Sequence, residues 1–404
     1  SVESDHAIVQ NTAPTAPTIS VYGASTPPIE ATDDLTCEIT GASTDLDGDS
    51  ITYTYNWYDD SNTLQQSYAN TTDTMDVFLG AGTTAGIWTC EVIASDGTDT
   101  SSTMEMIDVD SDWAGAVTFT NCGQTGRTGP SQAQCNSEYS GGLLDGYVTV
   151  NAGIQEWVVP ETDIYLITVY GAQGGDTNAS FLGGEGAILS GEFALNQGDV
   201  LQILVGQRGG NSPSPGSSGH AAGGGGGSFV SLNGSPLLVA GGGGGSGSAN
   251  TCSGANSNLI PGIAGQSTEY ASDGRGVNCL NAANTIGYGG GSDLCNNGAT
   301  SGAGYYGDSV AYSPSSWGTK ADAFVNGGLG SLQRTTGGDG GFGGGGAGAY
   351  GGGGGGGYSG GGTGDYDTPC RDQGGGGGGS YNSGSNPSNS TGGHQGQGMV
   401  QIDR

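Results

Sequence analysis

The sequence predicts an all-β protein with almost no α-helix. We expect an immunoglobulin-like β-sandwich, then a jelly-roll-like β domain that carries an inserted bundle of polyglycine-II helices. Three observations lead to this prediction. Short runs that alternate apolar and polar residues recur from the start of the chain, which is the period of half-buried strands. Glycine contributes 88 of the 404 residues and is concentrated after Gly171. A strand-like run returns at the very end, at Met399–Ile402.

The first β domain is expected over residues 19–110. Its alternating runs lie at residues 18–22, 35–39, 51–57, 74–78, 86–93 and 103–109. Cys37 lies on an early run, Trp57 on a central one and Cys90 on a late one, as in sandwiches with an inter-sheet disulfide packed on a tryptophan. Residues 1–18 before it form an N-terminal arm or linker. The short run at residues 6–10 is either part of a flexible leader or a strand that pairs with a neighbouring sheet edge.

This segment also carries a resemblance. The strings Ser43-Thr-Asp-Leu-Asp-Gly-Asp-Ser50, Tyr53-Thr-Tyr-Asn-Trp57 and Ser95-Asp-Gly-Thr98 occur in that order. Together they resemble the immunoglobulin-, PKD- or cadherin-like repeats of large secreted bacterial surface proteins, particularly those of myxobacteria. The resemblance covers about a quarter of the chain and implies a β-sandwich.

A connector with a small disulfide loop is expected over residues 111–144, and the glycine-rich domain over residues 145–404. The glycine-rich domain contains strand-like runs at residues 147–150, 155–160, 163–170, 186–193, 200–205, 228–232, 236–240 and 399–402. Because the last run closes the domain, the glycine tracts are insertions between strands. The alternative is a disordered low-complexity tail, which the closing strand disfavours.

The glycine tracts themselves predict a bundle. Ordering one backbone residue costs about 1–2 kcal/mol, and glycine has no side chain whose burial would offset that cost. A single threefold extended helix leaves its N–H and C=O groups pointing outward, whereas several such helices can satisfy one another. The expected helices are residues 223–227, 241–245, 287–291, 337–346, 351–357, 360–364 and 374–379.

A second resemblance covers most of this half. It is carried by Trp157-Val-Val-Pro-Glu-Thr-Asp-Ile-Tyr165, Val169-Tyr-Gly-Ala-Gln-Gly-Gly175, Gly223-Gly-Gly-Gly-Gly-Ser-Phe-Val230 and Leu237-Leu-Val-Ala-Gly241. These strings resemble the glycine-rich extracellular region of the anaplastic lymphoma kinase and leukocyte tyrosine kinase receptors. They are similar, more loosely, to the polyglycine-helix tip adhesins of T-even-like phages. The resemblance implies a tumour-necrosis-factor-like sheet fused to a glycine bundle. It does not imply signalling, because no kinase-like segment is visible.

Charge and cysteine content place the chain outside the cell. Asp and Glu number 39 against 7 Lys and Arg, a net charge of −32 that excludes nucleic-acid binding. The eight cysteines form no C-x-x-C pair and indicate disulfides in an oxidising compartment. The spacing suggests Cys37–Cys90 and Cys122–Cys135; Cys252, Cys279, Cys295 and Cys370 could pair as Cys252–Cys279 and Cys295–Cys370, but this stays open. No apolar run reaches the ~20 residues of a membrane span, and Ser1 reads as a mature terminus or the end of a trimmed chain.

One candidate metal site lies in the first domain. Asp45, Asp47 and Asp49 alternate around Gly48, and Asp96 lies in a second turn. Carboxylate oxygens at this spacing suit Ca²⁺. The alternative is a solvated acidic hairpin.

The expected function is structural or adhesive rather than catalytic. Matches to Gly-x-Gly-x-x-Gly arise by chance in so much glycine, and His6, His220 and His394 lie in no catalytic motif. Aromatic residues punctuate the glycine tracts, and Tyr350, Tyr358 and Tyr366 are possible adhesive residues; the alternative is that they wedge the bundle. We expect a subunit of an extracellular fibre that assembles with copies of itself. The other hypothesis is an adhesin that recognises a glycan or a cell-surface partner.

Overall fold

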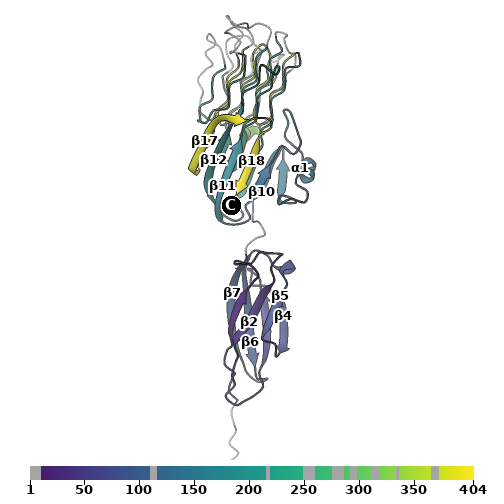
Figure 1. Ribbon diagram of the computed structural model, residues 1–404, viewed down its shortest axis with the longest axis vertical. Helices are drawn as coiled ribbons and strands as arrows, with labels where there is room; N and C mark the ends of the chain where they lie inside the picture. The colour runs from purple at the N-terminus through teal and green to yellow at the C-terminus, as the bar shows by residue number, and fades with distance from the viewer. Residues whose placement is uncertain are drawn as a thin grey trace, which may run out of the picture. The chain divides into compact units, whose positions relative to one another are not determined.

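The computed structural model describes residues 11–109, 116–214, 219–248, 260–274, 286–291, 298–310, 318–333, 336–364 and 373–404. The chain divides into two compact units, Ser1–Ala114 and Gly115–Arg404 (Figure 1). The structure is nearly all β, as the sequence predicts.

The first unit is a sandwich of two antiparallel sheets. Its strands are β1 (Thr18–Tyr22), β2 (Leu35–Gly41), β3 (Thr52–Tyr58), β4 (Leu64–Thr71), β5 (Met75–Phe78), β6 (Gly86–Ser95) and β7 (Thr100–Val109). One sheet has the order β1-β2-β5 and the other β4-β3-β6-β7. Alternate residues of both sheets are buried between them, with Trp57 and Trp88 among the largest side chains of the core. The Cys37–Cys90 disulfide joins β2 of one sheet to β6 of the other, and the predicted immunoglobulin-like sandwich is confirmed.

The second unit is a larger sandwich that carries the glycine tracts. Its strands are β8 (Val117–Phe119), β9 (Val148–Asn151), β10 (Ile154–Val158), β11 (Asp163–Tyr170), β12 (Gly186–Leu195), β13 (Val200–Leu204), β14 (Ser228–Leu232), β15 (Ser235–Ala240), β16 (Tyr381–Asn382), β17 (Ser385–His394) and β18 (Met399–Asp403). Six strands form the sheet β16-β15-β14-β13-β10-β9, and five form β17-β12-β11-β18-β8. The C-terminal strand β18 lies between β11 and β8, so the chain does close on a core strand.

Part of the expected connector belongs to the second unit. Residues 117–119 form β8, which pairs with β18. Downstream lies the short helix α1 (Gln132–Glu138), whose Ser131 and Gln134 form a capping box. The Cys122–Cys135 disulfide fixes this helix to the turn after β8. The expected small disulfide loop is present, but it is packed onto a sheet and is not a free connector.

The glycine bundle grows directly out of the second sandwich. Strands β11, β13 and β15 continue into residues 171–175, 205–210 and 241–248, and residues 219–227 lead into β14. Figure 1 shows the tracts extending from one end of the sheet that contains β11, β12 and β18. The backbone N–H groups in these segments donate with a repeat of three. Gly223 and Gly226 both donate to the segment 207–210, Gly224 and Gly227 to the segment 343–346, and Gly225 to Gly243. A threefold repeat with partners on three sides is the arrangement expected of packed polyglycine-II helices.

One expected helix is in fact two. The tract 337–346 reverses at Phe342–Gly344, where Gly343 and Gly344 have φ of +98° and +81°. Its two arms pair with each other, since Gly345 donates to Gly341 and Gly348 donates to Gly338. A run of glycines carries no turn signal of its own, because glycine adopts positive φ without a steric cost.

Candidate binding surface

A stack of buried aromatic rings lies between β14 and the glycine bundle. The ring centroids of Phe229 and Phe324 are 5.1 Å apart, and those of Phe324 and Tyr305 are 4.8 Å apart. Tyr305 is fully buried, and its hydroxyl lies 2.8 Å from Ser231 Oγ and donates to the Gly234 carbonyl at 3.1 Å. The stack is therefore fixed to the sheet by both packing and hydrogen bonds.

From this stack, further rings lead outward to the protein surface. Tyr306 meets Tyr305 edge-on at 4.7 Å and is 44% exposed. Tyr288 lies 6.4 Å from Tyr306 and is 50% exposed. Tyr358 lies 6.3 Å from Tyr306 and 4.7 Å from Tyr381, but it is only 9% exposed. Tyr288 and Tyr306 are thus the outer end of an aromatic cluster whose inner end is core.

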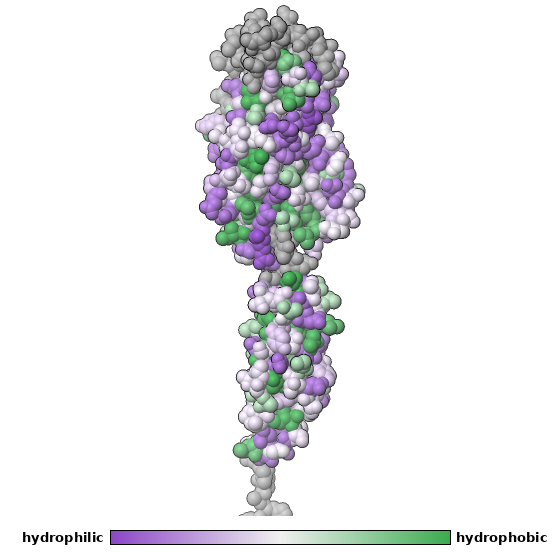
Figure 2. All heavy atoms as spheres, viewed as in Figure 1, coloured by the Kyte–Doolittle hydropathy of each residue, from purple (hydrophilic) through white to green (hydrophobic). Residues whose placement is uncertain are grey.

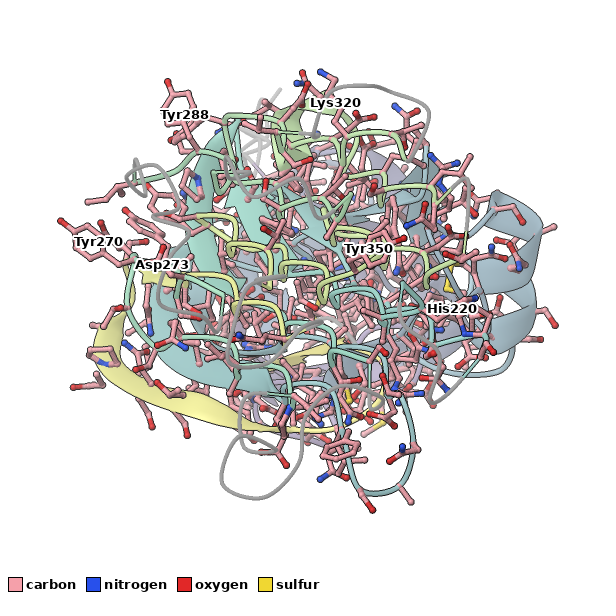
Figure 3. The ribbon with its side chains drawn as sticks, turned by 90° about the horizontal axis from the view of Figure 1, so that it is seen from above. His220, Tyr270, Asp273, Tyr288, Lys320 and Tyr350 are labelled. Carbon is pink, nitrogen blue, oxygen red and sulfur yellow. A yellow bond between two sulfur atoms is a disulfide. The ribbon has the colours of Figure 1, made fainter. Side chains whose placement is uncertain are left out.

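A buried serine brings a third exposed tyrosine to the same side. The Ser359 hydroxyl accepts a hydrogen bond from the Gly287 N–H at 3.0 Å and donates one to the Glu269 carbonyl at 2.7 Å. Tyr288 and Tyr270 follow these two partners closely in the chain, and Tyr270 is 58% exposed. Both side chains project outward on one side of the bundle (Figure 3). We call Tyr270, Tyr288 and Tyr306 the tyrosine surface.

The inner tyrosines of this cluster are suited to packing and not to proton transfer. Burial, reinforced by the neighbouring Tyr306 and Glu269, raises the pKa of Tyr358 to about 12. Burial also raises the pKa of Tyr305. Both phenols therefore remain protonated near neutral pH. Rings of this kind, apolar on their faces with one polar tip, are the side chains that most often anchor protein interfaces.

The three tyrosines that the sequence suggested as adhesive do not form one surface. Tyr358 is part of the buried cluster. Tyr350 is half-buried, with its ring against Gly219, where an added β-carbon would lie 3.1 Å from the ring. Tyr366 lies outside the described residues. Tyr270, in contrast, escapes the sequence reasoning because it follows a polar Gln266-Ser-Thr-Glu stretch and no glycine tract.

The acidic turns of the first unit are bridged by the segment before β1. Asn11 donates from its amide to Asp96 at 3.0 Å and to Asp99 at 2.9 Å. The Thr12 N–H donates to Asp47 at 2.7 Å. These contacts tie the linker to the same loops that carry the candidate calcium ligands.

The candidate ligands themselves are largely turned into their own loops. Asp45 Oδ1 accepts the N–H groups of Asp47 and Asp49, and Asp96 Oδ1 accepts those of Thr98 and Asp99. Asp45 Oδ2 is buried without a hydrogen-bond partner. Across the described residues, no three His, Cys, Asp or Glu side chains converge as a metal site would require.

Two of the suggested disulfides are formed, Cys37–Cys90 and Cys122–Cys135. Cys252, Cys279, Cys295 and Cys370 lie outside the described residues. The described part of the chain contains no apolar helix of membrane-spanning length. On the face drawn in Figure 2, hydrophobic residues are scattered singly among hydrophilic ones.

No family model matches the chain. Over 110 residues it is 43% identical to the leukocyte tyrosine kinase receptor of Mus musculus. The match covers 26% of this chain and 12% of the receptor, in its extracellular and not its catalytic part. The resemblance to the glycine-rich region of that receptor is therefore supported for part of the chain. The disulfides and this similarity are consistent with an extracellular β protein.

Proposed function

We propose that this chain is a non-enzymatic extracellular binding module whose glycine bundle holds the tyrosine surface rigidly toward a partner. The observation that carries the proposal is the placement of Tyr270, Tyr288 and Tyr306. They are 44–58% exposed, yet their segments are tied to a buried aromatic stack and to the buried Ser359. An aromatic side chain that is already immobilised loses little conformational entropy when it binds.

The partner is a glycan or a protein on a cell or matrix surface. Tyrosine rings stack on sugar rings and also anchor protein interfaces, so the chemistry of the tyrosine surface fits both. The similarity of part of the chain to a receptor supports a binding role without naming a ligand.

The test is a surface-binding assay with the fluorescently labelled full chain. Binding of the labelled chain to cells or extracellular matrix is measured before and after these are treated with protease or glycosidase. We expect Tyr288→Ser combined with Tyr306→Ser to reduce binding at least about tenfold, the loss of one or two interface anchors. Tyr147→Ser is the matched control, because Tyr147 is 68% exposed and lies outside the aromatic cluster. Equal binding by all three proteins would rule the proposal out, and the enzyme that abolishes binding identifies the partner's class.

A second candidate function, a fibre subunit that joins copies of itself, is favoured by a different surface. The outer face of the β4-β3-β6-β7 sheet exposes Met104 by 61%, Met106 by 69% and Ile87 by 39%. Register places Met104 beside Glu91 and Met106 beside Thr89, so both methionines lie on the face opposite the core. The strand-like run at residues 6–10, which could pair with a neighbouring sheet edge, lies outside the described residues.

Calcium binding by Asp45, Asp47, Asp49 and Asp96 is also a proposal. The buried, unpartnered Asp45 Oδ2 supports it, because an oxygen without a hydrogen-bond donor is available to a cation. Calorimetric titration with calcium should release or absorb heat, and a chelator should lower the melting temperature of the first unit. The absence of both effects would show that these residues do not bind calcium.

A further inference from the structure

A groove lies on the second unit, distinct from the tyrosine surface. It has a volume of about 540 Å³ and runs between three segments: the turn that leads into α1, the turn between β9 and β10, and the loop around the 3₁₀ turn Phe324–Asn326. Near Ala152 and Gly327 it continues into a second hollow of about 350 Å³. Together these hollows are within the size range of small-molecule binding sites.

Polar and apolar groups line both parts of the groove. The larger part has amide and hydroxyl side chains and one carboxylate, contributed by Gln124, Thr128, Ser131, Gln132, Gln134, Asp322 and Asn326, beside apolar residues such as Leu329 and Phe342. The smaller part has Ile154, Phe324 and Val325 beside the polar Asn151 and Gln202. Val325 is 51% exposed and Ile154 is half-buried, so their aliphatic groups are accessible at its rim. A ligand in the groove therefore meets hydrogen-bonding and apolar groups side by side.

Most of the polar wall is held in place before any ligand arrives. Gln132 donates to the Val148 carbonyl at 2.8 Å and accepts the Val150 N–H at 2.7 Å. Gln134 donates to Gln124 at 2.8 Å, and Gln124 donates to the Thr128 hydroxyl at 3.0 Å. Side chains fixed by their neighbours lose little entropy on binding, and they keep the remaining hydrogen-bonding atoms in one orientation.

Two groups in the groove are left with unused acceptor capacity. No described residue donates a hydrogen bond to the Asp322 carboxylate, which is half-buried. Burial, and then the neighbouring Asp308, raise its pKa, while Lys320 and Arg127 act in the opposite direction. Asn326 donates from its amide nitrogen to Asp308 at 2.7 Å, and this leaves its amide oxygen free to accept. The Asp322 carboxylate and the Asn326 amide oxygen can therefore both accept hydrogen bonds from a ligand in the groove.

The ligand chemistry follows from this arrangement. A metal ion would need about six oxygen ligands, yet Asp308 is already engaged by Lys320, by the Ala323 N–H and by Asn326. An amine would use Asp322 but leave the amides and the apolar side chains of the groove unmatched. A sugar has hydroxyl donors for the acceptors, hydroxyl acceptors for the amides, and C–H faces for the apolar side chains beside them. We propose that this groove binds a neutral sugar of about two rings, with Asp322 and Asn326 accepting its hydroxyl hydrogens.

The experiment is saturation-transfer difference NMR on the full chain, followed by calorimetric titration. The probes are lactose, maltose, cellobiose and N,N′-diacetylchitobiose, with spermidine as the cationic comparison. We expect at least one disaccharide to bind. Asp322→Ala and Asn326→Ala should each weaken it about tenfold, the cost of one lost hydrogen bond to a charged or fixed acceptor. Asp273→Ala is the matched control, because Asp273 is exposed and lies on the side of the bundle that carries Tyr270 (Figure 3).

The outcomes separate this inference from the proposed function. Melting curves show whether each variant is folded, and the pair of single variants keeps the test valid if one of them is not. Binding that survives both variants, binding of spermidine alone, or no binding of any disaccharide would overturn the inference. Cell-surface binding of the tyrosine variants and disaccharide binding of the Asp322 and Asn326 variants are measured separately, so failure of the tyrosine surface and failure of the groove are distinguishable.

Discussion

At the scale of single residues, the glycine bundle depends on missing β-carbons. A β-carbon added at Gly354 would lie 2.1 Å from the Gly361 carbonyl oxygen and 2.6 Å from the Gly302 nitrogen. Both neighbours are backbone atoms that themselves hydrogen-bond across the bundle, since Gly302 donates to Gly361 and Gly354 donates to Thr300. Neither can move without breaking another contact. The tracts are therefore glycine because of the packing distance and not because of flexibility.

Gly354→Ala should consequently destabilise the second unit. We expect a loss of about 1–3 kcal/mol or more in the free energy of unfolding, the cost of forcing extra atoms into a filled interior. The measurement is differential scanning calorimetry of the whole chain. Gly142→Ala serves as control, because its β-carbon would meet its nearest neighbour, the Tyr139 carbonyl oxygen, only at 3.3 Å. Equal melting temperatures for the two variants would contradict steric packing as the reason for glycine.

The buried phenol of Tyr358 predicts a loss of stability in alkali. Its pKa is about 12 in the folded protein and near 10 in an unfolded chain, so the folded state holds the proton more tightly. Between about pH 10 and 12 the unfolded state ionises first, and the free energy of unfolding falls as the pH rises. Tyr358→Phe should flatten this part of the profile, measured by urea unfolding at a series of pH values. An unchanged slope would mean that Tyr358 is not responsible.

At the scale of elements, we expect the Cys122–Cys135 disulfide to stabilise the second unit by holding α1 against the turn after β8. The bond closes a loop with a sequence separation of 13. Removing a disulfide that closes such a loop lowers the free energy of unfolding by about 3 kcal/mol, because the unfolded chain gains conformational entropy. Cys122→Ser with Cys135→Ser should therefore destabilise the second unit and increase amide exchange in α1 and β8. The melting transition of the first unit is the internal control. A shift in that transition alone would contradict a stabilising role of this disulfide in the second unit.

The elements that sequence reasoning missed share one physical property. Strand β17 reads Ser-Asn-Pro-Ser-Asn-Ser-Thr-Gly-Gly-His and is mostly exposed, so it has no apolar alternation. Strand β4 is an exposed edge strand, rich in glutamine, serine and asparagine. Both are held by backbone pairing to a neighbour, β12 and β3 respectively, and pairing leaves no mark in side-chain hydrophobicity. Strands that bury a face, such as β3 and β11, are predictable for the opposite reason.

The candidate sites were less predictable than the fold. The tyrosine surface joins the segments of Tyr270 and Tyr288 through Ser359, and Tyr306 joins them by donating its N–H to the Gly287 carbonyl. Each tyrosine comes from a different segment of the chain. The sugar groove joins the turn before α1 to Asp322, which lies far along the chain. Spacing in sequence carries no information about such encounters, because the bundle brings the segments together through backbone hydrogen bonds that any glycine can make. The disulfides were predictable where two cysteines lie on recognisable strands, as Cys37 and Cys90 do.

At the scale of the whole molecule, net charge opposes any contact between copies. A charge of −32 repels another copy over about 30 Å in 10 mM salt, but over only about 3 Å at 1 M. The outer face of the first unit, with Met104, Met106 and Ile87, is apolar enough to attract once that repulsion is screened. Self-association of the fibre candidate should therefore be weak at low ionic strength and strengthen with salt or calcium.

Met104→Lys should suppress this association at high salt, because it places a hydrated charge in the centre of the apolar face. Leu79→Lys is the matched control: it changes the net charge by the same amount at a residue that is 66% exposed, directly before the 3₁₀ turn Gly80–Gly82 of the same unit. Sedimentation velocity over a salt series, followed by negative-stain electron microscopy, measures the effect. If Leu79→Lys suppresses association as strongly as Met104→Lys, charge alone controls it. If the unsubstituted chain stays monomeric at high concentration with salt and calcium, the fibre candidate fails, and binding through the second unit remains as the function.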